Sequence, residues 1–460
     1  MNNSLSKLVL ISALMLAACA PNMAYRTNAP PADGVCSGTP QSCGDQYWQR
    51  LGVQPNETGP SPTNSVHLGY VEFDDQGALF DPDRKRRMMD QIEAIGAEHP
   101  LLLVVFVHGW KHNASADDGN AASFARALRR IAAMDESLCA GAPCERRRVV
   151  GVYVGWRGLS LKLPGLKNLT FWTRKSRAHR VGTDGVTEVL NELKLIENSS
   201  QKAELARLDA AHLPHSRRDE LSRMVVTGHS FGSAVVFTAL QQQIMRDTVF
   251  RNQGSVQRSA ADLVVLINPA FEAARVDALQ RRLREWDHGK TQRPVLAVFT
   301  SEEDVATRTA FPMGRTLGTF THSYASDEQR AKDRTTVGHY RPFITHELRL
   351  RDAQISEQAP LQLSSYNDFR CSWRDFQRTD EVDIWDLGDI LLERDKSIQT
   401  KSQRRNPFYN VRVKPEIIQD HNDIWGDRFG EFLYRFVAVQ SASLSNCPQN
   451  RSASTGTDGK

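Results

Sequence analysis

The amino-acid sequence predicts an α/β protein with a mostly parallel central sheet that is covered by helices on both faces. Strand segments and helix segments alternate along most of the 460 residues. The strand at residues 101–107 reads LLLVVFV, an unbroken apolar run that is typical of a strand buried on both faces. Strict alternation of such strands with helices favours a parallel sheet between two helical layers.

The expected elements follow one another in a regular order. The strand at 101–107 is preceded by one at 66–73, whose alternating pattern is typical of a sheet edge. We expect further strands at 148–154, 223–227, 262–267, 294–300 and 408–413. Helical periodicity predicts helices at 82–95, 120–134, 178–197, 273–286 and 423–439, and one from the end of the 223–227 strand to about residue 245.

The regular order breaks down between residues 307 and 405, which are polar and show only short helical patches. We interpret this stretch as a lid or cap inserted before the last strand, and we expect it to contain helices because long structureless loops are rare. The core would then comprise residues 64–306 and 406–447. Residues 19–63 resemble a tether in composition, and residues 448–460 are expected to be disordered.

The first residues have the pattern of an export signal. Lys7 precedes an apolar stretch at 8–18 that is too short to span a bilayer. The stretch ends in Leu16-Ala17-Ala18-Cys19, which resembles the lipobox of bacterial lipoproteins. This resemblance implies that signal residues 1–18 are removed, that Cys19 is diacylated (palmitate being a typical acyl group), and that Ala20 favours the outer membrane. An ordinary secretory signal with an unrelated cysteine is the alternative.

The net charge and the number of cysteines argue against nucleic-acid and zinc binding and favour disulfides. A net charge of +4 over 460 residues is close to balanced and does not indicate a basic surface that would bind nucleic acid. Six cysteines remain besides Cys19, an even number that suits disulfides in an oxidising compartment, and spacing suggests the pairs Cys36–Cys43, Cys139–Cys144 and Cys371–Cys447. Zinc is disfavoured because the pairs lack nearby histidines. We expect neither metal nor cofactor, and the oligomeric state is not indicated.

The motif with the most chemical content is Gly228-His229-Ser230-Phe231-Gly232. It joins a β-branched strand to a segment with helical character. A serine at a sharp strand-to-helix turn is lifted out of the sheet, where a base can reach its hydroxyl. The two glycines suit the points where such a turn brings backbone segments close together.

With this motif the chain resembles the α/β-hydrolase superfamily, over most of residues 66–439. The resemblance implies a nucleophile at Ser230, an acid after a later strand and a histidine after the last strand. Asp304 is the preferred acid in Ser301-Glu302-Glu303-Asp304, with both glutamates as alternatives. His421 is the preferred base because it lies between the last strand and the final helix, and His346 is the next candidate.

Two backbone N–H groups are candidates for stabilising an oxyanion. Phe231 begins the helix after the nucleophile, so its N–H is expected to lack a helical acceptor. The loop after the 101–107 strand opens with His108-Gly109-Trp110, similar to the superfamily's His-Gly-x turn, and the N–H of Trp110 is the second candidate. His108 itself is expected to brace this loop.

The resulting hypothesis is a membrane-anchored serine hydrolase that cleaves carboxylic esters, small or lipidic, through an acyl-enzyme. The same groups could serve an amidase, a thioesterase or a peptidase. A non-catalytic envelope lipoprotein with this fold is the alternative from another class.

Overall fold

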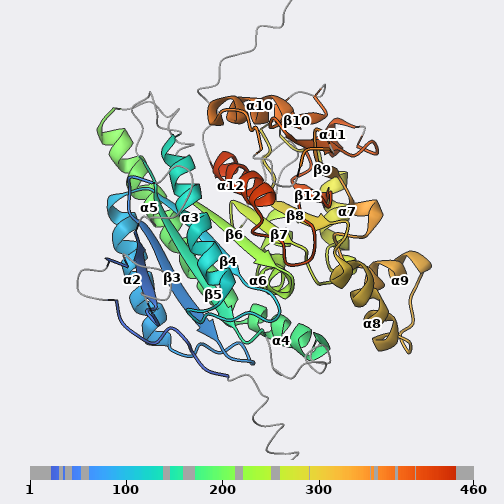
Figure 1. Cartoon of the computed structure of the whole chain (residues 1–460), viewed down its shortest axis with the longest axis horizontal. Helices are drawn as coiled ribbons and strands as arrows, with labels where there is room; N and C mark the ends of the chain where they lie inside the picture. Colours follow the sequence, from blue (N-terminus) through green and yellow to red (C-terminus); the bar gives the residue numbers. More distant parts are fainter. Residues whose placement is uncertain are drawn as a thin grey trace, which may run out of the picture.

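The computed structural model describes residues 22–30, 35–36, 44–52, 62–137, 146–158, 171–212, 221–249, 260–289, 291–352, 354–356, 361–378, 382–398 and 400–441. Its centre is a twelve-stranded sheet with the order β1-β2-β3-β5-β4-β6-β7-β8-β12-β9-β11-β10 (Figure 1). The strands are β1 Val35–Cys36, β2 Trp48–Leu51, β3 Val66–Phe73, β4 Leu101–Val107, β5 Arg148–Trp156, β6 Arg223–His229, β7 Leu263–Ile267, β8 Leu296–Ser301, β9 His346–Leu350, β10 Ile384–Asp386, β11 Ile390–Arg394 and β12 Phe408–Val413.

The sheet is mostly parallel, as the sequence predicts. The neighbouring strands from β3 to β9 in the sheet order all pair in parallel, whereas β2, β11 and β10 add antiparallel pairs at the two ends. The helices are α2 Pro82–Glu98, α3 Gly119–Ser137, α4 Phe171–Thr183, α5 Gly185–Ala210, α6 Phe231–Val249, α7 Asp277–Glu285, α8 Phe311–Gly318, α9 Asp327–Arg334, α10 Tyr366–Arg378, α11 Lys401–Arg404 and α12 Asp427–Ser441.

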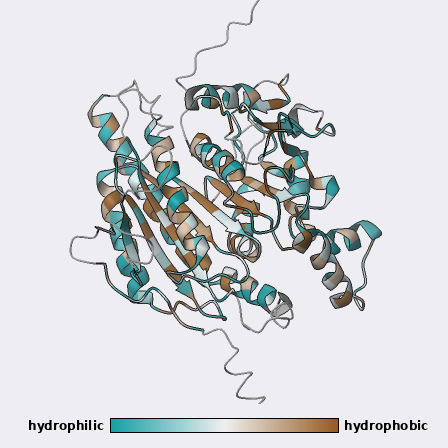
Figure 2. Cartoon of the chain, in the orientation of Figure 1, coloured by the Kyte–Doolittle hydropathy of each residue, from teal (hydrophilic) through white to brown (hydrophobic). Residues whose placement is uncertain are grey.

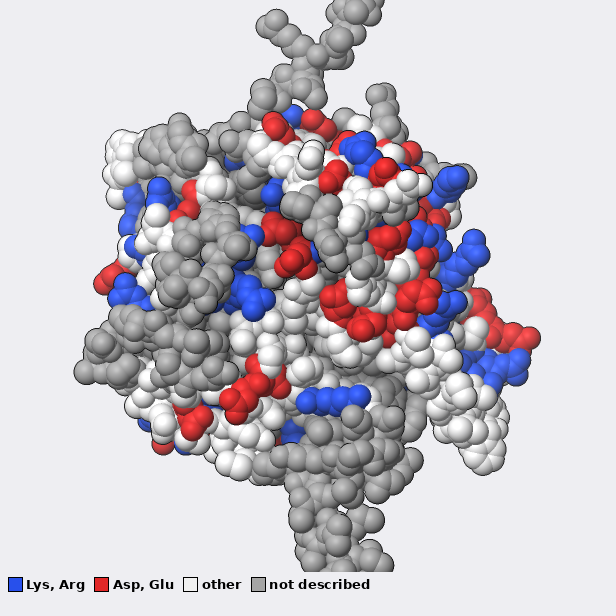
Figure 3. Space-filling view, viewed as in Figure 1, with Lys and Arg blue, Asp and Glu red and all other residues white. Residues whose placement is uncertain are grey.

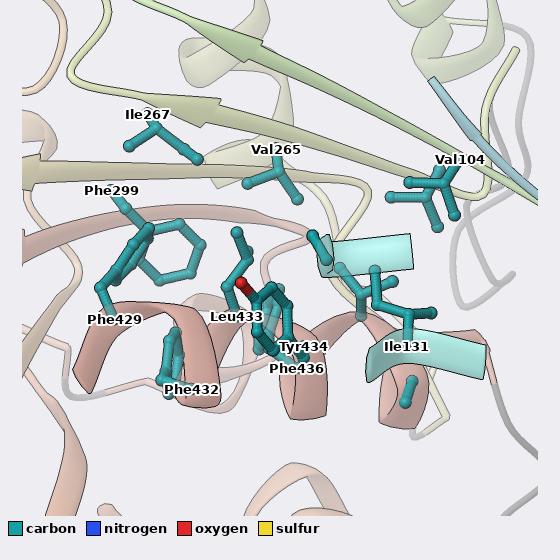
Figure 4. Packing of buried hydrophobic residues seen from close by; sticks show 14 of the residues in the cluster. Val104, Ile131, Val265, Ile267, Phe299, Phe429, Phe432, Leu433, Tyr434 and Phe436 are labelled. Carbon is teal, nitrogen blue, oxygen red and sulfur yellow. The ribbon is translucent and has the colours of Figure 1, made fainter. Parts of the chain in front are cut away.

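The apolar strands are buried on both faces because helices cover both sides of the sheet. Alternate side chains of β4 belong to two separate cores, with Val104 and Phe106 on one face and Val105 and Val107 on the other. Figure 2 shows these strands as mainly hydrophobic. On the first face α3 and α12 pack against the sheet, and Figure 4 shows Phe429 of α12 beside Phe299 of β8. Helices α2, α4, α5, α6 and α7 contribute to the second core.

Two segments are more tightly integrated than the sequence suggests. Part of the expected tether, residues 19–63, pairs as β2 with β3, and Arg26 in the same segment is buried, with its backbone N–H donating to Glu72. The expected lid, residues 307–405, supplies β9, β11 and β10, which continue the sheet beyond β12. In both cases short strands gain stability by pairing with an existing edge, an effect that local composition does not reveal.

Two helix boundaries also differ from those expected. The single helix expected at 178–197 is replaced by α4 and α5, which meet at Asp184. Here Gly185 approaches Phe73 and Gly77 so closely that a side chain would clash. The last helix was expected at 423–439, but α12 begins only at Asp427, and the Asp423 carboxylate accepts a hydrogen bond from the Gln419 N–H.

Several sequence predictions concern residues outside the described part of the chain. These include the signal at 1–18, Cys19, the tail at 448–460 and four of the cysteines, namely Cys43, Cys139, Cys144 and Cys447. Only the backbone of Cys36 is described. Cys371 is disulfide-bonded, and its pairing with Cys447 stays a prediction. Among the described residues, no helix is both long and apolar enough to cross a membrane.

Candidate functional site

The turn between β6 and α6 holds Ser230 in a strained conformation at the carboxyl edge of the sheet. The backbone φ angle of Ser230 is 56°, which lies in the left-handed region that residues other than glycine rarely adopt. A Cβ on Gly228 would lie 2.7 Å from the Gly232 carbonyl oxygen, and one on Gly232 would lie 2.1 Å from that of Val107. The steric argument for both glycines in the sequence is thereby confirmed.

The structure brings three of the predicted site residues together from separate parts of the chain. The Ser230 hydroxyl donates to His421 Nε2 at 2.8 Å, and His421 Nδ1 donates to Asp304 Oδ2 at 2.8 Å. Ser230 is 1% exposed and Asp304 is fully buried, whereas the His421 side chain is 15% exposed. The imidazole therefore separates a buried acid from the nucleophile and borders solvent itself.

The alternative acids and the alternative base lie elsewhere. Glu302 pairs with Arg412 and Lys414, while Glu303 is more than half exposed and faces Arg308. His346 is buried in β9, where its ring stacks on Tyr409 and its Nδ1 contacts the Thr345 hydroxyl. Among the residues that the structure describes, His421 and Asp304 form the hydrogen-bonded series with Ser230, and neither glutamate nor His346 takes part in it.

The environment of Asp304 keeps it ionised. Burial disfavours the carboxylate, but the attraction of His421 and hydrogen bonds from His421 and Thr307 outweigh it and lower the Asp304 pKa. The Thr307 hydroxyl donates to Asp304 Oδ2, and its backbone N–H donates to Oδ1. His339 Nε2 in turn contacts the Thr307 hydroxyl at 3.1 Å, and burial lowers the His339 pKa to about 4. The neutral imidazole of His339 can therefore donate a hydrogen bond to the Thr307 hydroxyl without bringing a positive charge near Asp304.

Sequence reasoning did not identify Asn268, whose side chain connects the loop that carries Asp304 with the loop that carries His421. Its Oδ1 accepts from the Ser301 N–H at 2.9 Å, and its Nδ2 donates to the carbonyl oxygens of His421 at 3.0 Å and Asp420 at 3.3 Å. Asn268 is completely buried and has a φ of 45°. Asn268 directly follows β7, and Ser230 directly follows the parallel strand β6, so both lie at the same edge of the sheet. This position after a predicted strand is the signal that could have identified Asn268.

His229 holds the same loop from the other side. Its Nε2 donates to the carbonyl oxygen of His421 at 2.8 Å, and the two rings lie 5.0 Å apart. The partner is 192 residues away along the chain. Burial first, and the neighbouring His421 second, lower the pKa of His229 well below its usual value. His229 is consequently a neutral donor.

The loop after β4 lies against the nucleophile. A Cβ on Gly109 would be 2.9 Å from Ser230 Cβ and 2.8 Å from His229 Nδ1, so only glycine allows this approach. His108 braces the loop as predicted: its Nε2 accepts from the Trp156 N–H at 3.0 Å, and the Trp156 indole N–H donates to its carbonyl oxygen at 2.9 Å. Trp156 is thus occupied in supporting this loop.

The two predicted oxyanion donors occupy suitable elements. Phe231 is the first residue of α6, and Trp110 follows Gly109 in the loop that touches Ser230. Helix α6 directs the positive end of its dipole toward this turn. Their role as donors stays a prediction. Among the described residues no group of three or more histidine, cysteine or acidic side chains could hold a metal ion.

Comparison with known proteins adds little. No protein-family model matches the chain, and no curated protein matches it. One solved structure, a Trichoderma reesei cutinase in complex with a C11Y4 phosphonate inhibitor, aligns with 13% sequence identity over 41% of this chain and 67% of its own. The TM-score of 0.15 is too low to support an argument. The functional interpretation therefore depends on the geometry of the site.

Proposed function

We propose that this chain is a serine hydrolase of the α/β-hydrolase type that cleaves carboxylic esters through an acyl-enzyme. The observation that carries the proposal is the continuous hydrogen-bonded series Ser230–His421–Asp304, with both distances at 2.8 Å. A serine hydroxyl is a weak nucleophile unless an adjacent base removes its proton, and the base works best when an acid fixes its orientation.

In the acylation step Ser230 Oγ attacks the ester carbonyl carbon while its proton passes to His421 Nε2. The carbonyl oxygen becomes an oxyanion, for which the backbone N–H groups of Trp110 and Phe231 are the proposed donors. The tetrahedral intermediate then collapses, and His421 returns the proton to the departing alkoxide. The products are an alcohol and an ester of Ser230.

In the deacylation step water attacks the acyl-enzyme carbonyl, and its proton passes to the same nitrogen of His421. Collapse of the second intermediate releases a carboxylic acid and returns the proton to Ser230. Asp304 stays ionised throughout, because its lowered pKa favours the charged form that stabilises the imidazolium.

Export and attachment to the outer membrane through a diacylated Cys19 are part of the proposal and depend on the lipobox resemblance. A small-molecule or lipidic ester is the proposed substrate, without cofactor or metal. Amides, thioesters and peptides react through the same groups, so only assays of the individual substrates can separate these activities.

The test is covalent labelling by a fluorophosphonate probe, which reacts with an activated serine. The wild-type chain should label, and Ser230→Ala and His421→Ala should not. His346→Ala is a matched control, because it removes a buried histidine away from Ser230. A panel of esters with increasing acyl length, each compared with the corresponding amide and thioester, then defines the substrate class.

Two results would overturn the proposal. Strong labelling of His421→Ala would show that His421 is not the base. A folded wild-type chain that did not label would favour a non-catalytic envelope protein, in which the buried Ser230–His421–Asp304 series serves stability alone.

A further inference from the structure

An exposed apolar ridge follows the loop that carries Asp304. Eight large hydrophobic side chains are exposed in the described part of the chain, and four of them fall between residues 305 and 320. Met313, Leu317 and Phe320 are 64%, 75% and 82% exposed. Met313 and Leu317 are four residues apart and so lie on one side of α8, and Phe320 follows in the turn after the helix. We call Met313, Leu317 and Phe320 the α8 ridge.

The opposite side of α8 is fixed to the body of the protein, so the ridge has a defined orientation. Phe311 is fully buried, and Arg315 forms ion pairs with Asp333 and Glu272. Helix α8 projects from the body in Figure 1, and Figure 3 shows a surface without acidic or basic side chains at this lower right corner. Three large apolar side chains close together on a fixed projection are unusual for a surface that contacts only water.

The ridge is continuous with the candidate active site. Val305, which is 65% exposed, directly follows Asp304. The π-helical turn Ala306–Ala310 leads from there into α8, and Thr307 of this turn donates to Asp304. At about 1.5 Å per residue, the ridge begins roughly 14 Å along the helix from Asp304. A surface bound by the ridge would therefore lie beside the site.

A polar hollow adjoins the ridge and carries net positive charge. It is lined by Phe320 of the ridge together with His322, Tyr324, Ala325, Ser326, Asp327, Arg330 and Arg334. Two guanidinium groups face one carboxylate here, and Arg330 is half exposed while it pairs with Asp327. An apolar ridge beside a cationic hollow complements a surface whose acyl chains lie beneath anionic headgroups.

The N-terminal segment flanks the same edge of the sheet. The buried Arg26 donates to the carbonyl oxygens of Ala114 and Gly44, and Glu72 accepts from its backbone N–H. Met23, three residues earlier, is 52% exposed and borders a small pocket shared with the loop after β4. Cys19 precedes Met23 by four residues, which span at most about 14 Å. A lipid on Cys19 would hold this edge near the bilayer.

From these observations we infer that the α8 ridge docks on the surface of an anionic phospholipid bilayer and turns the Ser230 edge of the sheet toward it. The ridge side chains enter the acyl region, and Arg330 and Arg334 contact lipid phosphates. The orientation relative to the anchor depends on the proposed lipidation of Cys19. Binding by the ridge itself does not.

The test is sedimentation with vesicles of phosphatidylcholine alone or mixed with phosphatidylglycerol. The chain from residue 20 onward lacks the anchor but keeps every contact described here. The ridge variant Met313→Ser, Leu317→Ser, Phe320→Ser is compared with a control that replaces three exposed hydrophobic side chains elsewhere, Leu195→Ser, Val249→Ser, Ile384→Ser. We expect at least tenfold weaker partitioning of the ridge variant alone, since each lost side chain removes apolar burial.

Arg330→Gln tests the headgroup contact, and it should reduce the preference for phosphatidylglycerol about threefold or more. The inference fails if the wild-type chain stays in the supernatant, or if ridge and control variants lose binding equally. It also fails if the ridge variant abolishes only self-association, which would make the ridge an interface between copies. Fluorophosphonate labelling of each variant separates this inference from the proposed function: vesicle binding without labelling would refute only the latter.

Discussion

Substitution of Asn268 tests whether the position of His421 depends on the loop that carries it. The Asn268 amide bridges three strand ends by accepting from the Ser301 N–H and donating to the carbonyl oxygens of Asp420 and His421. Asn268→Gly removes all three hydrogen bonds and tolerates the φ of 45°. Asn268→Asp keeps the shape and the acceptor but places a second oxygen against the two carbonyl oxygens.

The magnitude follows from these contacts. Three buried hydrogen bonds at ~1 kcal/mol each predict that Asn268→Gly lowers the free energy of unfolding by about 3 kcal/mol. Asn268→Ala should lose about 1 kcal/mol more, because alanine resists a positive φ. If the His421 loop shifts by about 1 Å, the rate of serine labelling should fall roughly 100-fold, since this is the typical cost of such a displacement.

The assay combines urea unfolding with the rate of fluorophosphonate labelling for each variant. Asn406→Asp is the control, because Asn406 is a buried asparagine whose Oδ1 accepts from the Phe408 N–H at the opposite end of β12. It should lose stability without slowing the labelling of the folded protein. Wild-type labelling rates in Asn268→Asp and Asn268→Gly would refute the positioning role.

Three further predictions concern the same edge of the sheet. Gly109→Ala should reduce labelling at least 100-fold in a folded protein, because its Cβ would meet Ser230 Cβ at 2.9 Å; unchanged labelling would contradict this packing. Thr307→Val should raise the Asp304 pKa, measured by NMR titration, and slow labelling about tenfold, whereas Thr307→Ser should restore both. Burial lowers the pKa of His108 from 6.5 to about 4. Between pH 6.5 and pH 4 the unfolded chain therefore binds a proton at His108 that the folded chain does not bind. Stability should therefore fall as pH decreases through this window, by ~2 kcal/mol at pH 5 for this group; equal urea midpoints at pH 7 and pH 5 would contradict it.

The core strands and the candidate site could be predicted because each leaves a local pattern. The run at Leu101–Val107 is apolar at every position, as burial on both faces requires. Ser230 stands out because two glycines flank it for steric reasons that the structure confirms. The carboxyl ends of parallel strands meet at one edge, so the chain order of Ser230, Asp304 and His421 was informative about their proximity.

Other features depend on pairing over long distances and leave no such pattern. β9 and β11 pair with each other and extend the sheet beside β12, although their segment is polar and irregular in sequence. Arg26 is buried because backbone carbonyl oxygens far along the chain accept its hydrogen bonds. An arginine in a proline-rich segment predicts a solvated side chain, and only the tertiary partners reverse this expectation.

The distribution of backbone strain gives an independent reason to place function at the carboxyl edge of the sheet. Four residues other than glycine have a positive φ in the described part of the chain, and three of them, Lys111, Ser230 and Asn268, follow or end β4, β6 and β7. The fourth, His212, lies just beyond the end of α5, where left-handed residues are common. Each strained residue costs roughly 1–3 kcal/mol and persists only where the surroundings hold it. Three neighbouring strand ends share this cost because the loops must bring Gly109, Ser230 and the His421 loop into contact.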